Sequence, residues 1–196
     1  ENQAFQLDAI ASTVNLFNGM QSLALSEQLA NQNEILSYDL VANGLQLNEL
    51  QLLKNLQSIQ LLNSLENYAT ELYYGEYAFK RKDDAGNEIE PLIKIPNVSI
   101  EMETGTGKTY VYLRTAFELN KRYGLTKFIV VVPSDAIRAG VLKSLEITKE
   151  HFKSEYNNVS YDYYQYDSEK ISKVRDFATT NSIQIMVMTI AAFNKD

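Results

Sequence analysis

The apolar positions of the first 65 residues recur with helical spacing. One stripe of apolar side chains runs from Ile10 to Phe17, and a second, rich in leucine, lies between residues 52 and 59. A recurrence every three or four residues places such side chains on one face of a helix. Asn48, which precedes the second stripe, is a residue type that favours the helix N-cap. The pattern predicts two helices whose apolar faces pack in the protein core.

The next segment combines short extended runs with turn-forming residues. Residues 79–82 and 89–95 flank the cluster 83–87, which is rich in the residue types of tight turns. Pro91 cannot donate a ladder hydrogen bond, so the second arm is expected at a sheet edge. We therefore predict a β-hairpin, whose turn carboxylate Asp83 bonds its own backbone rather than a metal.

After residue 95, apolar runs alternate with longer segments of helical spacing. This alternation is typical of a parallel sheet with helices packed on it, so the expected fold class is α/β. The tyrosines between residues 161 and 166 are expected to pack rather than to stack on bases. The expected elements are a strand at 97–102, a helix at 109–123 closed by Gly124, a buried strand at 128–132, a long helix at about 135–156, a strand at 159–166, a short helix at 169–178 and an apolar strand at 183–188.

The composition excludes several classes of protein. Hydrophobic residues make up 45% and charged residues 22% of the 196 positions, which argues against a disordered chain. The longest uninterrupted apolar run, Phe128–Val132, is far shorter than the roughly 20 residues of a membrane helix. The sequence has no cysteine, which fits a reducing, cytoplasmic location. The one histidine, His151, leaves little room for a histidine metal cluster.

The net charge of −7 is unevenly distributed along the chain. Residues 108–153 carry nine basic and four acidic side chains, whereas the remainder is acidic. A local basic surface can follow a phosphate backbone. On charge alone, a solvated helix face explains this stretch equally well.

The most informative motif is the run Glu103–Thr109, with the sequence ETGTGKT. It follows an expected strand and precedes an expected helix, which is the context of a phosphate-binding loop. Its glycines allow backbone N–H groups to face phosphate oxygens at a helix N-terminus. Lys108 is expected to bind the β- and γ-phosphates, and Thr109 to give its hydroxyl to Mg²⁺. The common pattern has a glycine where this chain has Met102.

Residues 97–109 resemble motif I of superfamily 2 helicases and translocases. Other segments resemble further motifs of that superfamily, in the expected order. They are Phe5–Ile10 for the Q-type motif, Phe128–Ser134 with Arg138 for motif Ia, and Ile185–Thr189 for the strand and DNA-contacting turn before the acidic motif. No Asp-Glu pair follows an apolar strand, so the acidic motif itself is absent from this sequence.

Two linking segments narrow the resemblance. Leu113–Lys121 and Gly140–Thr148 are similar to the Res subunit of type III restriction enzymes. This resemblance implies an incomplete RecA-like P-loop parallel sheet. Residues 1–75 would form a helical segment with the Q-type motif, and residues 76–196 a small hairpin and the first part of the motor domain, cut before the acidic motif.

The resemblance also implies an activity. The whole subunit would hydrolyse ATP to translocate on duplex DNA before cleavage, with ATP and Mg²⁺ as cofactors and a methyltransferase (Mod) subunit as partner. This chain by itself, without the acidic motif, is expected to bind nucleotide and not to turn it over. Two alternatives stay open: another superfamily 2 helicase or translocase, or a non-catalytic module whose first 75 residues bind a partner subunit.

Individual residues receive roles from the same resemblance. Lys108 is the catalytic residue and Thr109 the metal ligand, while Arg138 and Thr189 contact the DNA backbone. Gln6 would select ATP, because an amide can pair with the N6 and N7 edge of adenine. The implied nucleotide-binding residues are Gln6, Thr104, Gly105, Thr106, Gly107, Lys108 and Thr109.

Overall fold

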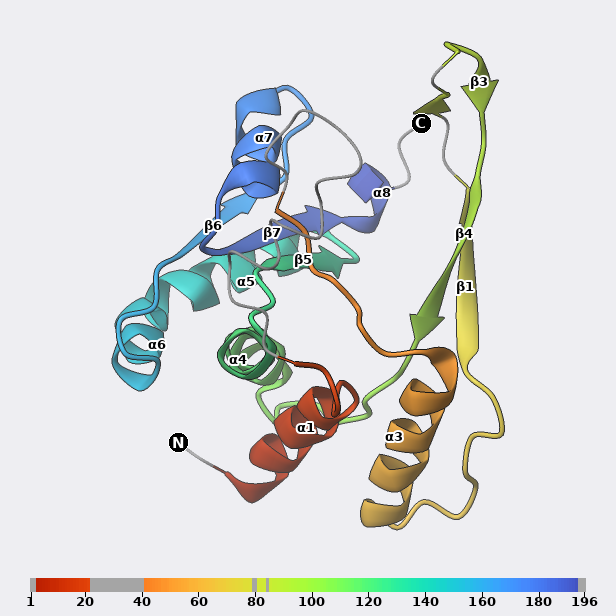
Figure 1. The fold of residues 1–196 in the computed structure, drawn as a ribbon. Helices are drawn as coiled ribbons and strands as arrows, with labels where there is room; N and C mark the ends of the chain where they lie inside the picture. The colour runs from red at the N-terminus through yellow and green to blue at the C-terminus, as the bar shows by residue number, and fades with distance from the viewer. Residues whose placement is uncertain (1–2, 22–40, 79–80, 84, 194–196) are drawn as a thin grey trace.

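The computed structural model describes residues 3–21, 41–78, 81–83 and 85–193 (Figure 1). Within them, no helix is both long and apolar enough to cross a lipid bilayer. The elements in chain order are α1 (Ala4–Asn15), α3 (Glu49–Leu62), β1 (Tyr73–Ala78), β2 (Arg81–Lys82), β3 (Glu88–Ile89), β4 (Leu92–Asn97), α4 (Lys108–Tyr123), β5 (Lys127–Val132), α5 (Asp135–Ile147), α6 (Lys149–Glu155), β6 (Tyr161–Gln165), α7 (Ile171–Thr179), β7 (Ile183–Thr189) and α8 (Ile190–Phe193).

The two helices predicted near the N-terminus are confirmed as α1 and α3. Asn48 caps α3 as expected, because its side chain accepts a hydrogen bond from the Gln51 amide at 2.9 Å. The Gln51 side chain in turn accepts one from the Asn48 amide at 3.1 Å, which completes a capping box. The apolar stripes of both helices pack in one core cluster with α4.

The predicted hairpin is also confirmed, with a longer first arm. β1 pairs with β4 and β2 with β3, both antiparallel, and the ribbon runs along one side of the molecule (Figure 1). Pro91 lies between β3 and β4. In the turn, the Asp83 carboxylate accepts hydrogen bonds from the backbone amides of Ala85 and Asn87. The side chain and backbone of Asn87 hold the pKa of Asp83 below its usual value, so this carboxylate serves the turn, as predicted.

Three parallel strands form the central sheet of the described residues, in the order β5-β7-β6. Every residue of the middle strand β7 is buried. On one face, Ile185 and Val187 join a core cluster with residues of α4, α5 and α6. On the other face lies α7 (Figure 1). Its Phe177 meets Tyr164 of β6 edge to face, with ring centroids 6.3 Å apart. The parallel α/β sheet predicted from the sequence is confirmed.

Helix α4 is buried on two faces, between α1 and the sheet (Figure 1). Val111 and Leu119 belong to the core shared with α1 and α3. Leu113 and Phe117 belong to the core shared with the sheet and α6. The helix ends at Gly124, whose φ of 74° is the left-handed conformation that favours glycine. The predicted boundary between a segment of residues 1–75 and one of residues 76–196 stays a prediction. Helix α1 of the first segment packs directly on α4 of the second.

The strand predicted at 97–102 is wrong. β4 ends at Asn97, and residues 98–102 are in neither a helix nor a strand. Val98 and Ile100 are 43% and 44% exposed. Alternating apolar residues favour a strand, but a strand also needs a neighbour that completes its backbone hydrogen bonds. None of the described ladders includes residues 98–102.

Two other predictions need correction. The helix predicted over 135–156 is two helices, because the backbone at Thr148 turns out of the helical conformation, with ψ near 2°. The Thr148 hydroxyl donates to the Ser144 carbonyl at 2.7 Å, and such bonds often bend helices. The strand predicted as buried at 128–132 is β5, but its Ile129 and Val131 are 49% and 42% exposed. β5 is an edge strand of the described sheet. Helices cover the face opposite to Ile129 and Val131, so the strand is buried on one side.

Candidate functional site

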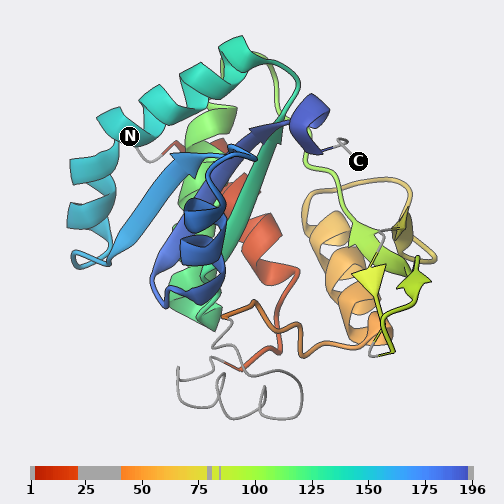
Figure 2. The same ribbon diagram turned by 90° about the horizontal axis from the view of Figure 1, so that it is seen from above.

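The ETGTGKT loop leads directly into α4, as the motif predicted. Gly105 and Gly107 have φ values of 82° and 84°, a left-handed conformation that glycine adopts without a steric penalty. Gly107 is the N-cap of α4, a helix of 16 residues. The free backbone N–H groups and positive dipole end of such a helix favour an anion. Figure 2 shows the start of α4 and the carboxyl ends of β5 and β7 at the same end of the molecule.

The loop is held closed by its own side chains. The Lys108 Nζ donates hydrogen bonds to the carbonyl oxygens of Met102, at 2.8 Å, and Glu103, at 2.6 Å. The Thr106 hydroxyl donates to the same Glu103 carbonyl at 2.7 Å. The ammonium is therefore held over the loop by neutral acceptors, which are weaker partners than a phosphate would be. Glu103 contributes its backbone carbonyl to these bonds.

Gln6 contacts the loop from α1, 100 residues away in the sequence. Its Nε2 donates to the Thr106 carbonyl at 2.8 Å. A Cβ added at Gly107 would lie 2.6 Å from the same Nε2, so a larger residue there would displace the Gln6 amide. A primary amide has two N–H donors and an accepting oxygen. Gln6 can therefore hold the loop and still offer a donor and an acceptor to a ligand.

Thr109 lies half-buried in the first turn of α4. Its side chain is hydrogen-bonded to the Tyr112 side chain, and burial raises the pKa of Tyr112. That phenol stays protonated near pH 7 and can donate to the threonine oxygen. The described residues contain no group of three or more histidine or carboxylate side chains placed to hold a metal. A metal at Thr109 would therefore need most of its other ligands from a bound phosphate group or water. Thr104 lies exposed in the loop.

The two predicted DNA contacts lie at the carboxyl ends of two neighbouring strands, β5 and β7. Arg138 is in the first turn of α5, directly after β5, and its Nη2 is 3.1 Å from Oδ1 of Asp135. Its side chain is 19% exposed, whereas that of Asp135 is 81% exposed. Thr189 ends β7 and is buried, and its hydroxyl accepts a hydrogen bond from the Ala192 amide at 3.3 Å. The Thr189 hydroxyl, which is the group predicted to contact DNA, therefore also caps α8.

The sequence profile described as "Type III restriction enzyme, res subunit" (ResIII) matches residues 46–196. The chain belongs to this family. The match includes the loop, α4, the whole sheet and the hairpin, and it agrees with the incomplete RecA-like α/β fold predicted above. Gln6 and α1 lie outside the matched range.

Three Res subunits resemble this ResIII chain over part of its length. The Res subunit of the type III restriction-modification enzyme EcoPI from Escherichia phage P1 is 36% identical over 130 residues, which cover 65% of this chain and 11% of that protein. The EcoP15I Res subunit of Escherichia coli is 49% identical over 61 residues, covering 30% and 6%. The StyLTI Res subunit of Salmonella typhimurium is 43% identical over 82 residues, covering 38% and 8%. The chain thus spans only a small part of each relative.

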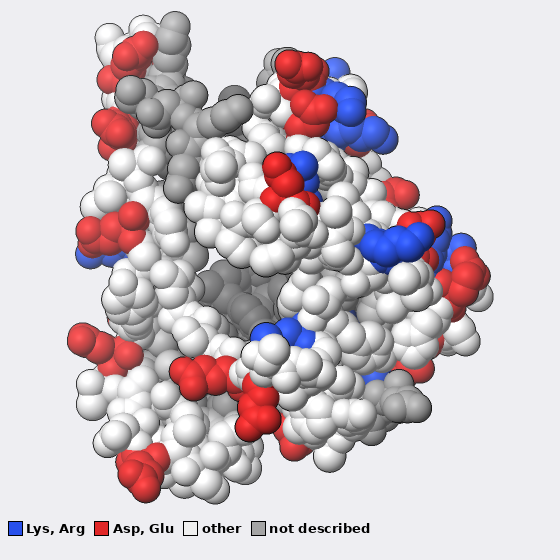
Figure 3. Space-filling model, turned by 180° about the vertical axis from the view of Figure 1, so that it is seen from behind, with Lys and Arg blue, Asp and Glu red and all other residues white. Residues whose placement is uncertain are grey.

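Several of the described cations of the ResIII chain are paired with carboxylates. On the face shown in Figure 3, most lysine and arginine atoms lie beside aspartate or glutamate atoms. Within the stretch predicted as basic, Lys143 is 2.9 Å from Glu146 and Lys153 is 3.3 Å from Glu150. Because such exposed pairs share their charge locally, the solvated-helix explanation accounts for much of this stretch.

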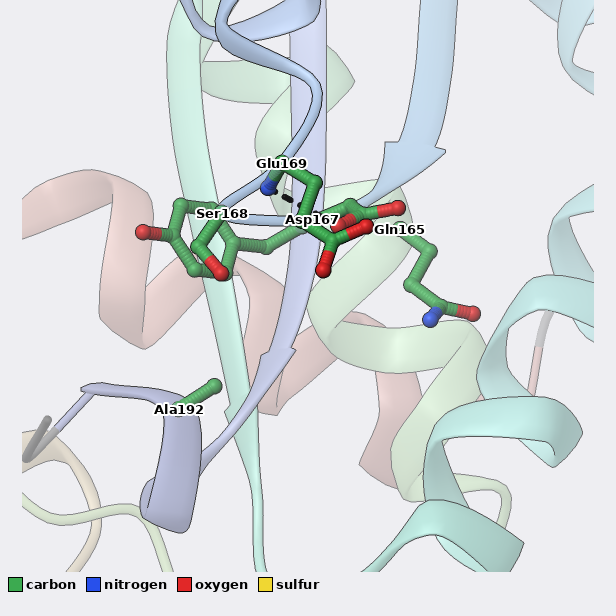
Figure 4. Close-up of a pocket in the computed structure, with 6 residues that line it drawn as sticks. Gln165, Asp167, Ser168, Glu169 and Ala192 are labelled. Atoms are coloured by element: carbon green, nitrogen blue, oxygen red, sulfur yellow. Dashed lines mark hydrogen bonds between the residues drawn. The ribbon is translucent and has the colours of Figure 1, made fainter.

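A pocket that the sequence did not indicate opens at the carboxyl end of β6. It measures about 360 Å³ and lies between the loop after β6 and Ala192 of α8 (Figure 4). In that loop, the Asp167 carboxylate accepts a hydrogen bond from the Glu169 amide at 3.1 Å and pairs with Lys170 at 3.1 Å. These contacts hold the pKa of Asp167 below its usual value. The Asp167 carboxylate that lines the pocket is therefore engaged in stabilising the loop itself.

A polar network on α4 was also not predicted from the sequence. Arg114 is buried, and its Nη2 is 3.0 Å from Glu155 of α6. Its Nε donates to the Tyr156 hydroxyl at 3.3 Å, and that hydroxyl donates to Glu118 at 2.7 Å. Burial is the main cause that raises the pKa of Tyr156, so the phenol remains a donor. A signal was present in the sequence, because Tyr110, Arg114 and Glu118 recur every fourth residue and must share one face of α4.

Proposed function

We propose that this chain is the ATP-binding part of a restriction endonuclease motor subunit, which hydrolyses ATP to translocate on duplex DNA before cleavage. The observation that carries the proposal is the junction of Gln6 with the ETGTGKT loop at the start of α4. The relatives, named as Res subunits of restriction-modification enzymes, support the assignment.

Each residue of the junction has a task in this proposal. Lys108 leaves the carbonyls of Met102 and Glu103 and turns its ammonium to the β- and γ-phosphates. The backbone amides around Gly107 bind phosphate oxygens, and the Thr109 hydroxyl ligates Mg²⁺. When bound with ATP, the ion neutralises charge that develops on the phosphates. We assign no residue of this chain to the activation of water, because no Asp-Glu pair follows an apolar strand.

The adenine preference gives the sharpest test. Replacing Gln6 with alanine is expected to reduce the preference for ATP over GTP by about 1–3 kcal/mol, the value of a bidentate amide–adenine pair. Titration of the chain with fluorescent ATP and GTP measures this directly. Gln3→Ala is a matched control, because Gln3 is an exposed amide at the same end of α1. Unchanged discrimination in Gln6→Ala would return Gln6 to a structural role at the loop.

Duplex DNA and a Mod methyltransferase are the proposed partners. Arg138 and Thr189 are the proposed DNA contacts, since Arg138 follows β5 and Thr189 ends β7, and ligands of parallel sheets bind at the carboxyl ends of strands. The Thr189 hydroxyl can donate to a phosphate oxygen while it accepts from Ala192. Arg138 would exchange its exposed partner Asp135 for a backbone phosphate.

Arg138→Ala is expected to weaken DNA binding by the whole protein on every sequence alike. A phosphate contact carries no base information, and its loss should lower the salt slope of binding by roughly one unit. Titrations at several salt concentrations measure both effects. Lys143→Ala is the control, because Lys143 is an exposed, ion-paired cation on the same helix. Equal affinities and parallel slopes for wild type and Arg138→Ala would remove Arg138 from the DNA path.

A further inference from the structure

We propose that Tyr110 is a positioning residue for the nucleotide site, because its hydroxyl fixes the first turn of α4 against α6. That turn carries Lys108 and Thr109. The proposal rests on the function proposed above and adds a residue that neither the loop motif nor the Q-type motif includes. It assigns Tyr110 no contact with the nucleotide.

Tyr110 is held from three sides. Its hydroxyl is 2.9 Å from Nε2 of His151, which belongs to α6. The Nη1 of Arg114, one turn further along α4, donates to the same hydroxyl at 3.3 Å. The Tyr110 ring stacks on Phe152 of α6, with centroids 5.7 Å apart and planes 15° apart. Hydroxyl and ring therefore tie the start of α4 to α6 by two kinds of contact.

The partners of Tyr110 are themselves fixed. The Arg114 side chain is 8% exposed and is paired with Glu155 of α6. Phe152 is fully buried and stacks on Phe117, with centroids 4.6 Å apart. A group that bonds to fixed partners gains a defined position, whereas a surface hydroxyl does not. Lys108 and Thr109 take their positions from the same turn.

The guanidinium of Arg114 can only donate, so the Tyr110 oxygen accepts from it. The same hydroxyl shares a second hydrogen bond with Nε2 of His151, in the direction that the histidine tautomer sets. Loss of the hydroxyl leaves α4 with the ring stack alone at this point. Small displacements of a group that acts on the reacting phosphate cost rate more than affinity, because the transition state requires the closer fit.

The test is Tyr110→Phe in the whole protein, which keeps the ring and removes the hydroxyl. We expect kcat for ATP hydrolysis to fall about fivefold to tenfold, the scale of one lost hydrogen bond, with KM for ATP within about twofold. His151→Ala should give the same loss, the double variant should lose no more, and His151→Gln, which restores a hydrogen-bonding group, should recover activity. Tyr123→Phe is the matched control, because its hydroxyl donates to the Val14 carbonyl near the other end of α4.

The outcomes separate the two proposals. An unchanged kcat in Tyr110→Phe, or additive losses in the double variant, would overturn the positioning role alone. A fall in kcat that Tyr123→Phe reproduces, with a matching fall in the unfolding temperature, would also overturn it, because it would show a purely structural contribution. A wild-type protein that hydrolyses no ATP would overturn the proposed function itself.

Discussion

Replacing Lys108 with alanine is expected to reduce ATP hydrolysis by the whole protein about 100- to 1,000-fold, the usual cost of removing one group that stabilises transition-state charge. The ammonium donates hydrogen bonds to the Met102 and Glu103 carbonyls at the start of α4, and a helix N-terminus favours a bound phosphate. A γ-phosphate in transfer gains charge on its outer oxygens, and Lys108 is the cation proposed to stabilise it. A steady-state ATPase assay measures the loss.

The control for Lys108 is Lys121→Ala, which removes an exposed lysine from the last turn of the same helix. It should leave hydrolysis within about twofold of wild type, because screening makes such a distant exposed charge weak at the loop. Hydrolysis retained by Lys108→Ala, with Lys121→Ala unchanged, would contradict the assignment of the loop to catalysis. Nucleotide binding measured on the same variants separates lost affinity from lost rate.

Replacing Phe117 with alanine is expected to lower the free energy of unfolding by about 3–5 kcal/mol, the range for large aromatic deletions in a core. Phe117 is 1% exposed and stacks on Phe152 and Tyr156, with ring centroids 4.6 Å and 5.1 Å away. It also meets Tyr161 edge to face at 4.9 Å. For a chain of this size, the loss corresponds to a fall of roughly 6–20 °C in the unfolding temperature.

Calorimetry or thermal circular dichroism measures this change. Phe5→Ala is the matched control, because Phe5 is 46% exposed on α1, and surface substitutions are usually within about 0.5 kcal/mol of neutral. Phe117→Leu should keep more stability than Phe117→Ala, since it refills part of the cavity. Equal unfolding temperatures for Phe117→Ala and wild type would show that α4 does not depend on this aromatic cluster.

The features that local chemistry dictates were predictable from the sequence. Gly107 and Gly124 mark the two ends of α4, because each takes a left-handed φ that other residues avoid. Asn48 marks the start of α3 through its side-chain cap. The apolar run at 183–188 predicted the strand β7 without any knowledge of the strands that pair with it. In each case the signal and the structure lie within a few residues of each other.

What the sequence did not predict depends on hydrogen-bond partners that the apolar spacing does not reveal. Val98 and Ile100 alternate like strand residues, but no described strand pairs with them. Thr148 bends the chain by a bond to its own helix, which the apolar spacing on either side does not reveal. The contact of Tyr110 with His151 joins two helices 41 positions apart. The spacing of Tyr110, Arg114 and Glu118 shows a polar stripe on α4, but it does not show that α6 packs against that stripe.

The contact between Gln6 and Thr106 also has a consequence for biosynthesis. A ribosome that adds about 5–20 residues per second takes roughly 5–20 s to pass from one residue to the other. During that interval the apolar stripe of α1 has been made, while α4, the helix that covers it, has not. Gln6, the residue proposed to select adenine, therefore leaves the ribosome 100 residues before Thr106 of the loop that it contacts.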